Sequence, residues 1–217
     1  MSTCGDAQAR HATIALVLYL NVYGALPMTL TALPDILSGN LTVIFCGINP
    51  GQSSAERGLH FANRSNRFWK VIHQAGFTPE CIAPEEGRSL LDYGCGLTTA
   101  VSRPTRSAGE LSWHEFIAAT DHLRTKIQTF APRHIAFLGK VAYQAIFDQK
   151  NVAWGCQFKT FAGAMVWVLP NPSGLNRAFS LEDLVAEYKL LYVESADLQV
   201  RGRIAMYPNV SNRHGDT

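Results

Sequence analysis

Apolar residues along the chain form two kinds of pattern, short continuous runs and longer segments with helical spacing. Three continuous runs, at 41–46, 134–138 and 165–169, are rich in β-branched or aromatic residues and are predicted to be buried strands. Strands that are apolar on both faces are typical of a parallel sheet covered by helices. The alternation of such runs with helical segments therefore predicts an α/β domain with a central parallel sheet.

The segments between these runs carry recognisable helix signals. Ser112 with Glu115, and Ser180 with Asp183, match the pattern in which a capping residue is followed by an acidic side chain three positions later. Gly76 follows an apolar helical repeat and can end it. Helices are thus predicted at 68–75, from 112 to about 130, at 141–147 and from 180 onward.

The charge composition is nearly balanced. Charged residues make up 17% of the chain and the formal net charge is +2, so any contact with nucleic acid must come from a local group of basic residues. We expect about half of one such group to contact phosphate, although scattered, solvated charges are the alternative. Its members are Arg57, Arg64, Arg67, Lys70, Arg103, Lys140 and Arg177.

The cysteines and histidines do not indicate a metal site. The five cysteines form no CxxC pair and the seven histidines no HxH or HExxH motif, so we expect no metal and no cofactor. Free thiols suit a reducing compartment, and we expect a cytoplasmic protein. The apolar stretch 12–26 is shorter than the ~20 residues of a membrane span. We read it as a peripheral helix or as sequence upstream of a start at Met28.

Two loops contain most of the candidate chemistry. GINPG at 47–51 and NPSGLNR at 171–177 each follow the carboxyl end of a predicted parallel strand. In open α/β sheets ligands bind at that edge. Glycine and proline fix backbone shapes that leave N–H groups free for a ligand, although the same residues also make ordinary turns.

Five motifs follow one another along the chain: GINPGQSS, Phe61-Ala62, NRFWKVIHQAGF, LGKVAY and WVLPNPSGLNR. Together they resemble the mismatch-specific uracil/thymine DNA glycosylase family, within the uracil-DNA glycosylase superfamily, from about Ala32 to Arg203. The resemblance implies a three-layer α/β/α sandwich around a central, mostly parallel four-stranded sheet. Residues 1–31 would form an N-terminal extension, 32–203 the glycosylase-like domain and 204–217 a polar tail, which we expect to be disordered.

The resemblance also implies roles for single residues. Asn49 matches the catalytic asparagine that positions the attacking water. The backbone around Ile48 and Phe61 matches the part that grips the pyrimidine, with the Phe61 ring stacked on the flipped base, and Asn171 matches an asparagine at the pocket mouth. Three residues match the wedge that fills the space left in the DNA and touches the opposite guanine: Gly174, Leu175 and Arg177.

Independent chemistry agrees with these roles. A base must leave the duplex before it can be reached, and an inserted apolar side chain such as Leu175 offsets part of the lost stacking. Phe61 is either a stacking platform for that base or a plain core residue. The carboxamide of Asn49 can orient a water but cannot accept its proton at neutral pH. Asn171 stands where more powerful relatives carry histidine, so we expect a slow enzyme.

Two positions leave the base preference open. Thr99 stands where family members carry lysine or asparagine near the base pocket, and it offers a shorter reach and no charge. Ser54 matches a position near C5 of the pyrimidine, where it would limit thymine, but a helix-capping serine is an equal alternative.

The predicted function is hydrolysis of the N-glycosidic bond of uracil, and of related pyrimidines such as ethenocytosine, opposite guanine. No lysine is placed obviously to form a Schiff base, so we expect a monofunctional enzyme that does not cleave the strand. The partner would be double-stranded DNA with a G:U-type mismatch, bound by a monomer and without a membrane. One alternative is a non-catalytic mismatch- or abasic-site-binding module on the same fold. Another is a doubly wound small-molecule enzyme, but no glycine-rich phosphate loop follows Cys46.

Overall fold

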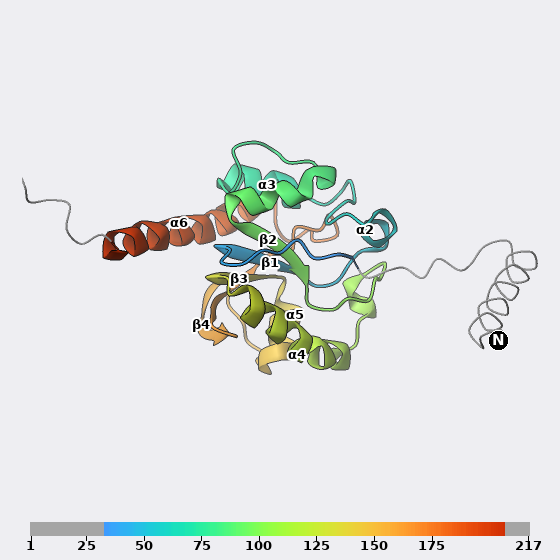
Figure 1. Cartoon of the computed structure of the whole chain (residues 1–217). Helices are drawn as coiled ribbons and strands as arrows, with labels where there is room; N and C mark the ends of the chain where they lie inside the picture. Colours follow the sequence, from blue (N-terminus) through green and yellow to red (C-terminus); the bar gives the residue numbers. More distant parts are fainter. Residues whose placement is uncertain (1–32, 207–217) are drawn as a thin grey trace, which may run out of the picture. The chain divides into compact units, whose positions relative to one another are not determined.

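The computed structural model describes residues 33–206, and for 198–206 the backbone alone. A five-stranded sheet forms its centre, in the order β2-β1-β3-β5-β4 (Figure 1). The strands are β1 (Val43–Gly47), β2 (Cys95–Thr99), β3 (His134–Leu138), β4 (Gly155–Phe161) and β5 (Ala164–Leu169). β1 lies parallel to both β2 and β3, and β3 is parallel to β5, whereas β4 runs antiparallel to β5. The predicted, mostly parallel sheet is therefore confirmed.

The predicted number of four strands is wrong, because the sheet has a fifth strand at its edge. This strand, β4, exposes most of its side chains, so it lacks the continuous apolar run of a central strand. It joins β5 through Ala162 and Gly163, whose φ values are 52° and 92°. Positive φ at both positions is what a two-residue type I′ hairpin requires.

Helices form where the capping signals predicted them. They are α3 (Phe68–Ala75), α4 (Trp113–Phe130) and α6 (Leu181–Met206), and α5 (Lys140–Phe147) forms where helical spacing predicted it. Three helices that were not predicted add to them: α2 (Gln52–Arg57) and the 3₁₀ segments η1 (Pro84–Tyr93) and η2 (Ala108–Glu110). Gly76 ends α3 with a φ of 101°, and Ser112 and Glu115 form the capping box of α4. α6 reaches beyond 204, where the tail was predicted to start. Residues 1–32 and 207–217 lie outside the described residues.

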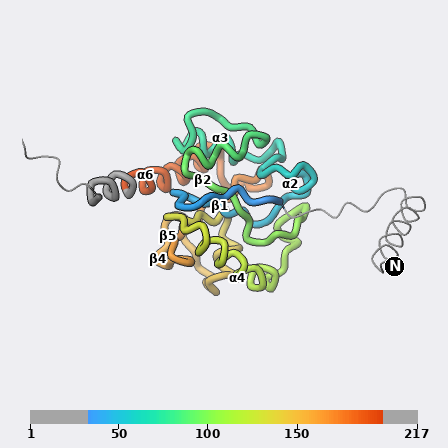
Figure 2. The backbone as a smooth tube through the Cα atoms, in the orientation of Figure 1, coloured from blue at the N-terminus to red at the C-terminus, as the bar shows by residue number. Residues whose placement is uncertain are grey.

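The helices cover both faces of the sheet (Figures 1 and 2). Side chains of β1 alternate between them: Val43 and Phe45 pack with α3, η1 and α6, while Ile44 and Cys46 pack with α4 and α5. All four are 1% exposed or less. The three-layer α/β/α arrangement is confirmed. Across the described part of the chain, no helix is long and apolar enough to cross a bilayer.

The parallel strands β1, β2, β3 and β5 end at the same edge of the sheet, because they point the same way. The loops at 47–51, 99–107 and 170–180 follow three of these ends, and α2 lies beside them (Figure 1). This edge is the one at which open α/β sheets bind ligands.

Candidate active site at the carboxyl edge of the sheet

A cleft of about 780 Å³ opens at this edge. The two motif loops form much of its wall, together with α2, the segment around 60–66 and the segment 105–108. Seven of the nine residues singled out from the sequence line it: Ile48, Asn49, Ser54, Phe61, Thr99, Asn171 and Leu175. The other two, Gly174 and Arg177, lie in the same loop as Leu175 but are not part of the lining.

The loop after β1 is held in place by the segment that follows β2. Four backbone hydrogen bonds of 2.8 to 3.1 Å join them: Ala100 N to Gly47 O, Val101 N to Ile48 O, Thr105 N to Pro50 O and Gln52 N to Thr105 O. Backbone pairing therefore continues past the ends of the two strands. A loop tied down at four points presents its side chains with little freedom, as a preorganised site requires.

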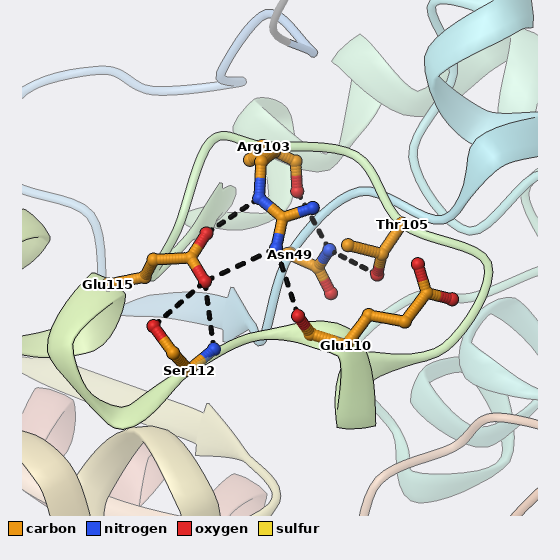
Figure 3. Close-up of polar contacts among 6 residues, drawn as sticks. All are labelled: Asn49, Arg103, Thr105, Glu110, Ser112 and Glu115. Carbon is orange, nitrogen blue, oxygen red and sulfur yellow. Dashed lines mark hydrogen bonds and ion pairs between the residues drawn. The ribbon is translucent and has the colours of Figure 1, made fainter.

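The amide of Asn49 has a single orientation in this setting. Its Nδ2 donates to the carbonyl oxygen of Arg103 and to Oγ1 of Thr105, both at 2.8 Å (Figure 3). A carbonyl oxygen only accepts, so the nitrogen must face Arg103 and the assignment of the amide atoms is fixed. Among the described residues none donates to Oδ1 of Asn49, which stays available as an acceptor for a water.

A charged network supports the Arg103 segment behind Asn49. The Arg103 guanidinium donates from Nε and Nη2 to the two carboxylate oxygens of Glu115, at 2.6 and 3.2 Å, and from Nη2 to the Glu110 carbonyl (Figure 3). Glu115 also accepts from the backbone N–H and the hydroxyl of Ser112 at the start of α4. These bonds, that of Arg103 foremost, lower the pKa of Glu115 to about 2. The carboxylate of Glu115 is therefore ionised at neutral pH and carries the charge that binds Arg103.

Phe61 sits in the cleft with an unusual backbone. Its φ is 52°, in the left-handed region that bulky residues rarely adopt. The ring stacks on Phe68 of α3, with centroids 4.1 Å apart and planes inclined by 24°. The next residue, Ala62, donates its N–H to Oγ of Ser54 at 3.2 Å. Ser54 therefore holds the turn that aims Phe61, rather than capping α2, whose N-cap is Gly51.

Thr99 and Asn171 approach the cleft from the ends of β2 and β5, which β1 and β3 separate in the sheet. Thr99 is the last residue of β2 and lies opposite Gly47 of β1. Asn171 folds its own loop, because its Oδ1 accepts from Ser173 N and its carbonyl accepts from Asn176 Nδ2, each at 2.9 Å. Within the described residues its Nδ2 has no acceptor, so this N–H group can serve a ligand.

The loop 171–177 also presents the predicted wedge. Leu175 is 77% exposed and belongs to neither apolar core cluster of the described residues, so its side chain can contact another molecule. Gly174 has a structural role that the sequence did not suggest. A Cβ on it would lie 2.6 to 2.7 Å from the side chain and the carbonyl oxygen of Ser65, so the loop packs there only because the residue is glycine.

Most members of the predicted basic group have partners within the protein. Arg57 binds Glu85 and the Ala62 carbonyl, Arg67 binds loop carbonyls, Arg103 binds Glu115, and Lys140 lies 4.3 Å from the ring centre of Trp154. Exposed members without a bonded partner among the described residues are Arg64, Lys70 and Arg177. These three remain as candidate phosphate contacts.

Some residues of the site could not be found from motifs. Thr105 accepts from Asn49 although it lies 56 positions further along the chain, and Glu115 in turn holds the side chain of Arg103. His60 also lines the cleft; it is buried, with Nε2 2.9 Å from the Pro34 carbonyl, and burial lowers its pKa. In the described part of the chain no group of three or more metal-ligating side chains is placed to hold a metal ion.

A mostly parallel sheet covered on both faces, with an asparagine and an aromatic ring in a cleft at its carboxyl edge, defines the class of protein. The model of the uracil DNA glycosylase superfamily matches residues 34–192, and the chain belongs to this superfamily. Membership supports a DNA glycosylase activity on uracil, with DNA as the partner.

A solved structure shows the same fold. It is the solution NMR structure of a Methanosarcina acetivorans protein that is provisionally named a uracil DNA glycosylase. The two chains are 21% identical, with a TM-score of 0.51, and the match covers 75% of this chain and 98% of that one.

Proposed function

We propose that the protein is a monofunctional glycosylase of the mismatch-specific uracil/thymine type, which removes uracil and related pyrimidines such as ethenocytosine opposite guanine. The observation that carries the proposal is the fixed amide of Asn49, whose nitrogen is held by Arg103 and Thr105 and whose oxygen is left for a water. The Phe61 ring in the same cleft, backed by Phe68, would provide a flat apolar surface for a flipped base.

The proposed reaction is a hydrolysis. The oxygen of the water forms a bond to C1′ of the deoxyribose, the C1′–N1 bond breaks, and its electron pair leaves with the uracil ring. The amide of Asn49 orients the water but has no basic site for the proton, which is lost to solvent. The ~10²- to 10⁴-fold contribution of a general base is therefore absent, and positioning carries the rate. Asn171 Nδ2 would donate to a pyrimidine oxygen as negative charge develops on it.

Base preference follows from the side chains around the ring. The Ser54 hydroxyl accepts from Ala62 N, which keeps it close to Phe61 and narrows the space for a 5-methyl group. Thr99, at the end of β2 and in the cleft lining, is short and uncharged. We therefore propose uracil over thymine, and tolerance of pyrimidines enlarged on the Thr99 side. We also propose that the protein acts as a monomer in the cytoplasm, that its partner is double-stranded DNA, and that it needs no cofactor.

The experiment is single-turnover base release from a duplex with one G:U pair, scored by alkaline cleavage. Asn49→Ala should lower the rate by ~10²-fold or more and leave mismatch binding within a few-fold. Asn151→Ala, an exposed asparagine outside the cleft, serves as the matched control. If the parent binds the mismatch without releasing base, the protein is instead a binding module. If Asn49→Ala releases base at the parental rate, the role of Asn49 is wrong.

A further inference from the structure

Arg67 holds the wedge loop, 171–179, through its side chain. It lies at the start of α3, and its side chain donates to four carbonyl oxygens of one loop. The acceptors are Phe179 at 2.7 Å, Asn176 at 2.8 Å, Ser173 at 3.1 Å and Pro172 at 3.4 Å. The backbone N–H of Arg67 adds a fifth bond, to Pro172 O at 3.0 Å.

The chemistry of the Arg67 side chain suits the binding of several carbonyls and argues against a contact with a DNA phosphate. A guanidinium carries five N–H donors in a rigid plane, no acceptor, and a permanent charge. Four carbonyls turned inward on it use most of those donors. No acidic residue among those described forms an ion pair with Arg67, so the carbonyl oxygens of the loop are what its guanidinium binds. Donors that point into the loop cannot also reach a DNA phosphate.

The carbonyls that face Arg67 determine which backbone N–H groups of the loop point away from it. The C=O and N–H of one trans peptide unit point in opposite directions. Because the carbonyls of Ser173 and Asn176 face Arg67, the N–H groups of Gly174 and Arg177 face away from it, and no described residue accepts from them. Leu175 stands between these two N–H groups and is 77% exposed. An exposed leucine stays in one place only if its backbone is held.

Arg67 also joins the loop to the base pocket. Its neighbour Phe68 is fully buried and stacks against Phe61. Residues 67 and 68 thus connect the surface proposed to hold the flipped base with the loop proposed to replace it in the DNA. We propose that Arg67 is a positioning residue that fixes the loop 171–179 for insertion of Leu175, and that it does not bind phosphate. This inference rests on the proposed function.

Two substitutions separate this role from a phosphate contact. Arg67→Lys keeps the charge but not the planar set of donors, and Arg67→Met removes both. We expect both to weaken binding to a duplex with an abasic site opposite guanine at least tenfold. The slope of log Kd against log salt should not change. Arg64→Met, at an exposed candidate phosphate contact, should instead reduce that slope by about 0.9. Lys189→Met, on the exposed side of α6, is the unchanged control.

Two further measurements complete the test. Hydrogen exchange of the free protein should rise across 171–180 in both variants and stay at the parental level in β1. Uracil release should fall at least tenfold on G:U duplex and by less than threefold on single-stranded DNA, where no wedge is needed.

The inference is wrong if Arg67→Lys binds like the parent while Arg67→Met loses about one unit of slope, or if single-stranded release falls as much as duplex release. If Arg67→Met is unfolded, which faster hydrogen exchange in β1 would show, the results for Arg67→Lys alone decide whether the inference holds. If the parent releases no base, the proposed function fails, and hydrogen exchange still decides whether Arg67 holds the loop.

Discussion

Replacing Thr105 by valine tests whether the orientation of Asn49 controls the rate. Thr105 is 5% exposed, and valine has nearly its shape but lacks the oxygen that accepts from Asn49 Nδ2 at 2.8 Å. The backbone bonds of Thr105 to Pro50 and Gln52 remain, so the loop keeps its register. The substitution thus removes one of the two acceptors of the amide and changes little else.

The expected loss follows from that one bond. A donor that loses its only partner inside a protein costs about 1–3 kcal/mol. With a factor of ten for each 1.36 kcal/mol, a cost felt entirely in the transition state slows base release by about 5- to 150-fold. Asn49 is only half-buried and keeps its bond to the Arg103 carbonyl. We therefore expect the lower part of this range, about 5- to 30-fold, and a smaller loss than for Asn49→Ala.

The assay is single-turnover uracil release from a G:U duplex, with urea unfolding of each variant measured in parallel. Thr105→Ser restores the oxygen without the methyl group and should stay within about threefold of the parent. A parental rate for Thr105→Val would refute the reasoning, since the amide would then need no second acceptor. So would a Thr105→Ser variant as slow as Thr105→Val, because packing of the methyl group would then be responsible.

Three further predictions concern the wedge loop and stability. Leu175→Ala should lower the first-turnover rate and release the abasic product faster, which a burst assay on G:U duplex measures. Gly174→Ala should destabilise the loop against Ser65, seen as faster proteolysis within 171–180, with the rest of the fold intact. Burial lowers the pKa of His134 to about 4 from its ordinary 6.5, so unfolding should become easier as the pH falls through that window, by at most about 3 kcal/mol. His134→Gln should flatten this dependence in urea titrations, and an unchanged dependence would contradict it.

Strands with strong apolar runs could be predicted from the sequence, whereas two others could not. β2 has the sequence CGLTT and is nearly all buried, although two of its five residues are polar and one is glycine. Gly96 is required because a Cβ there would lie 2.8 Å from the carbonyl oxygen of Ile36, which pairs antiparallel with Leu97 of β2. β4 could not be predicted because it lies at the edge of the sheet and exposes most of its side chains, and an edge strand can remain polar. Tertiary neighbours, rather than local pattern, decide both elements.

The candidate site shows the same limit. Its lining could be predicted, because Asn49 and Phe61 belong to motifs. The supports of Asn49 could not, since one is the backbone carbonyl of Arg103, which has no signature in a sequence, and the other is Thr105, which belongs to no motif. Arg67 illustrates the consequence: counted with the basic residues, it suggested a phosphate contact, but its side chain faces the carbonyls of a loop more than a hundred positions away.

The use of basic residues inside the protein bears on how it would hold DNA. Arg57, Arg67 and Arg103 bind carbonyls or carboxylates, and Lys140 lies over the Trp154 ring. Arg64, Lys70 and Arg177 are the exposed remainder of the group. Three phosphate contacts correspond to a salt slope of only about −2.7. Nonspecific attraction to any duplex is then weak, and affinity must come from contacts that form only when a base has left the stack. If the proposed function holds, an enzyme without a general base would gain from this, because it would have to stay at its target base long enough for a slow reaction.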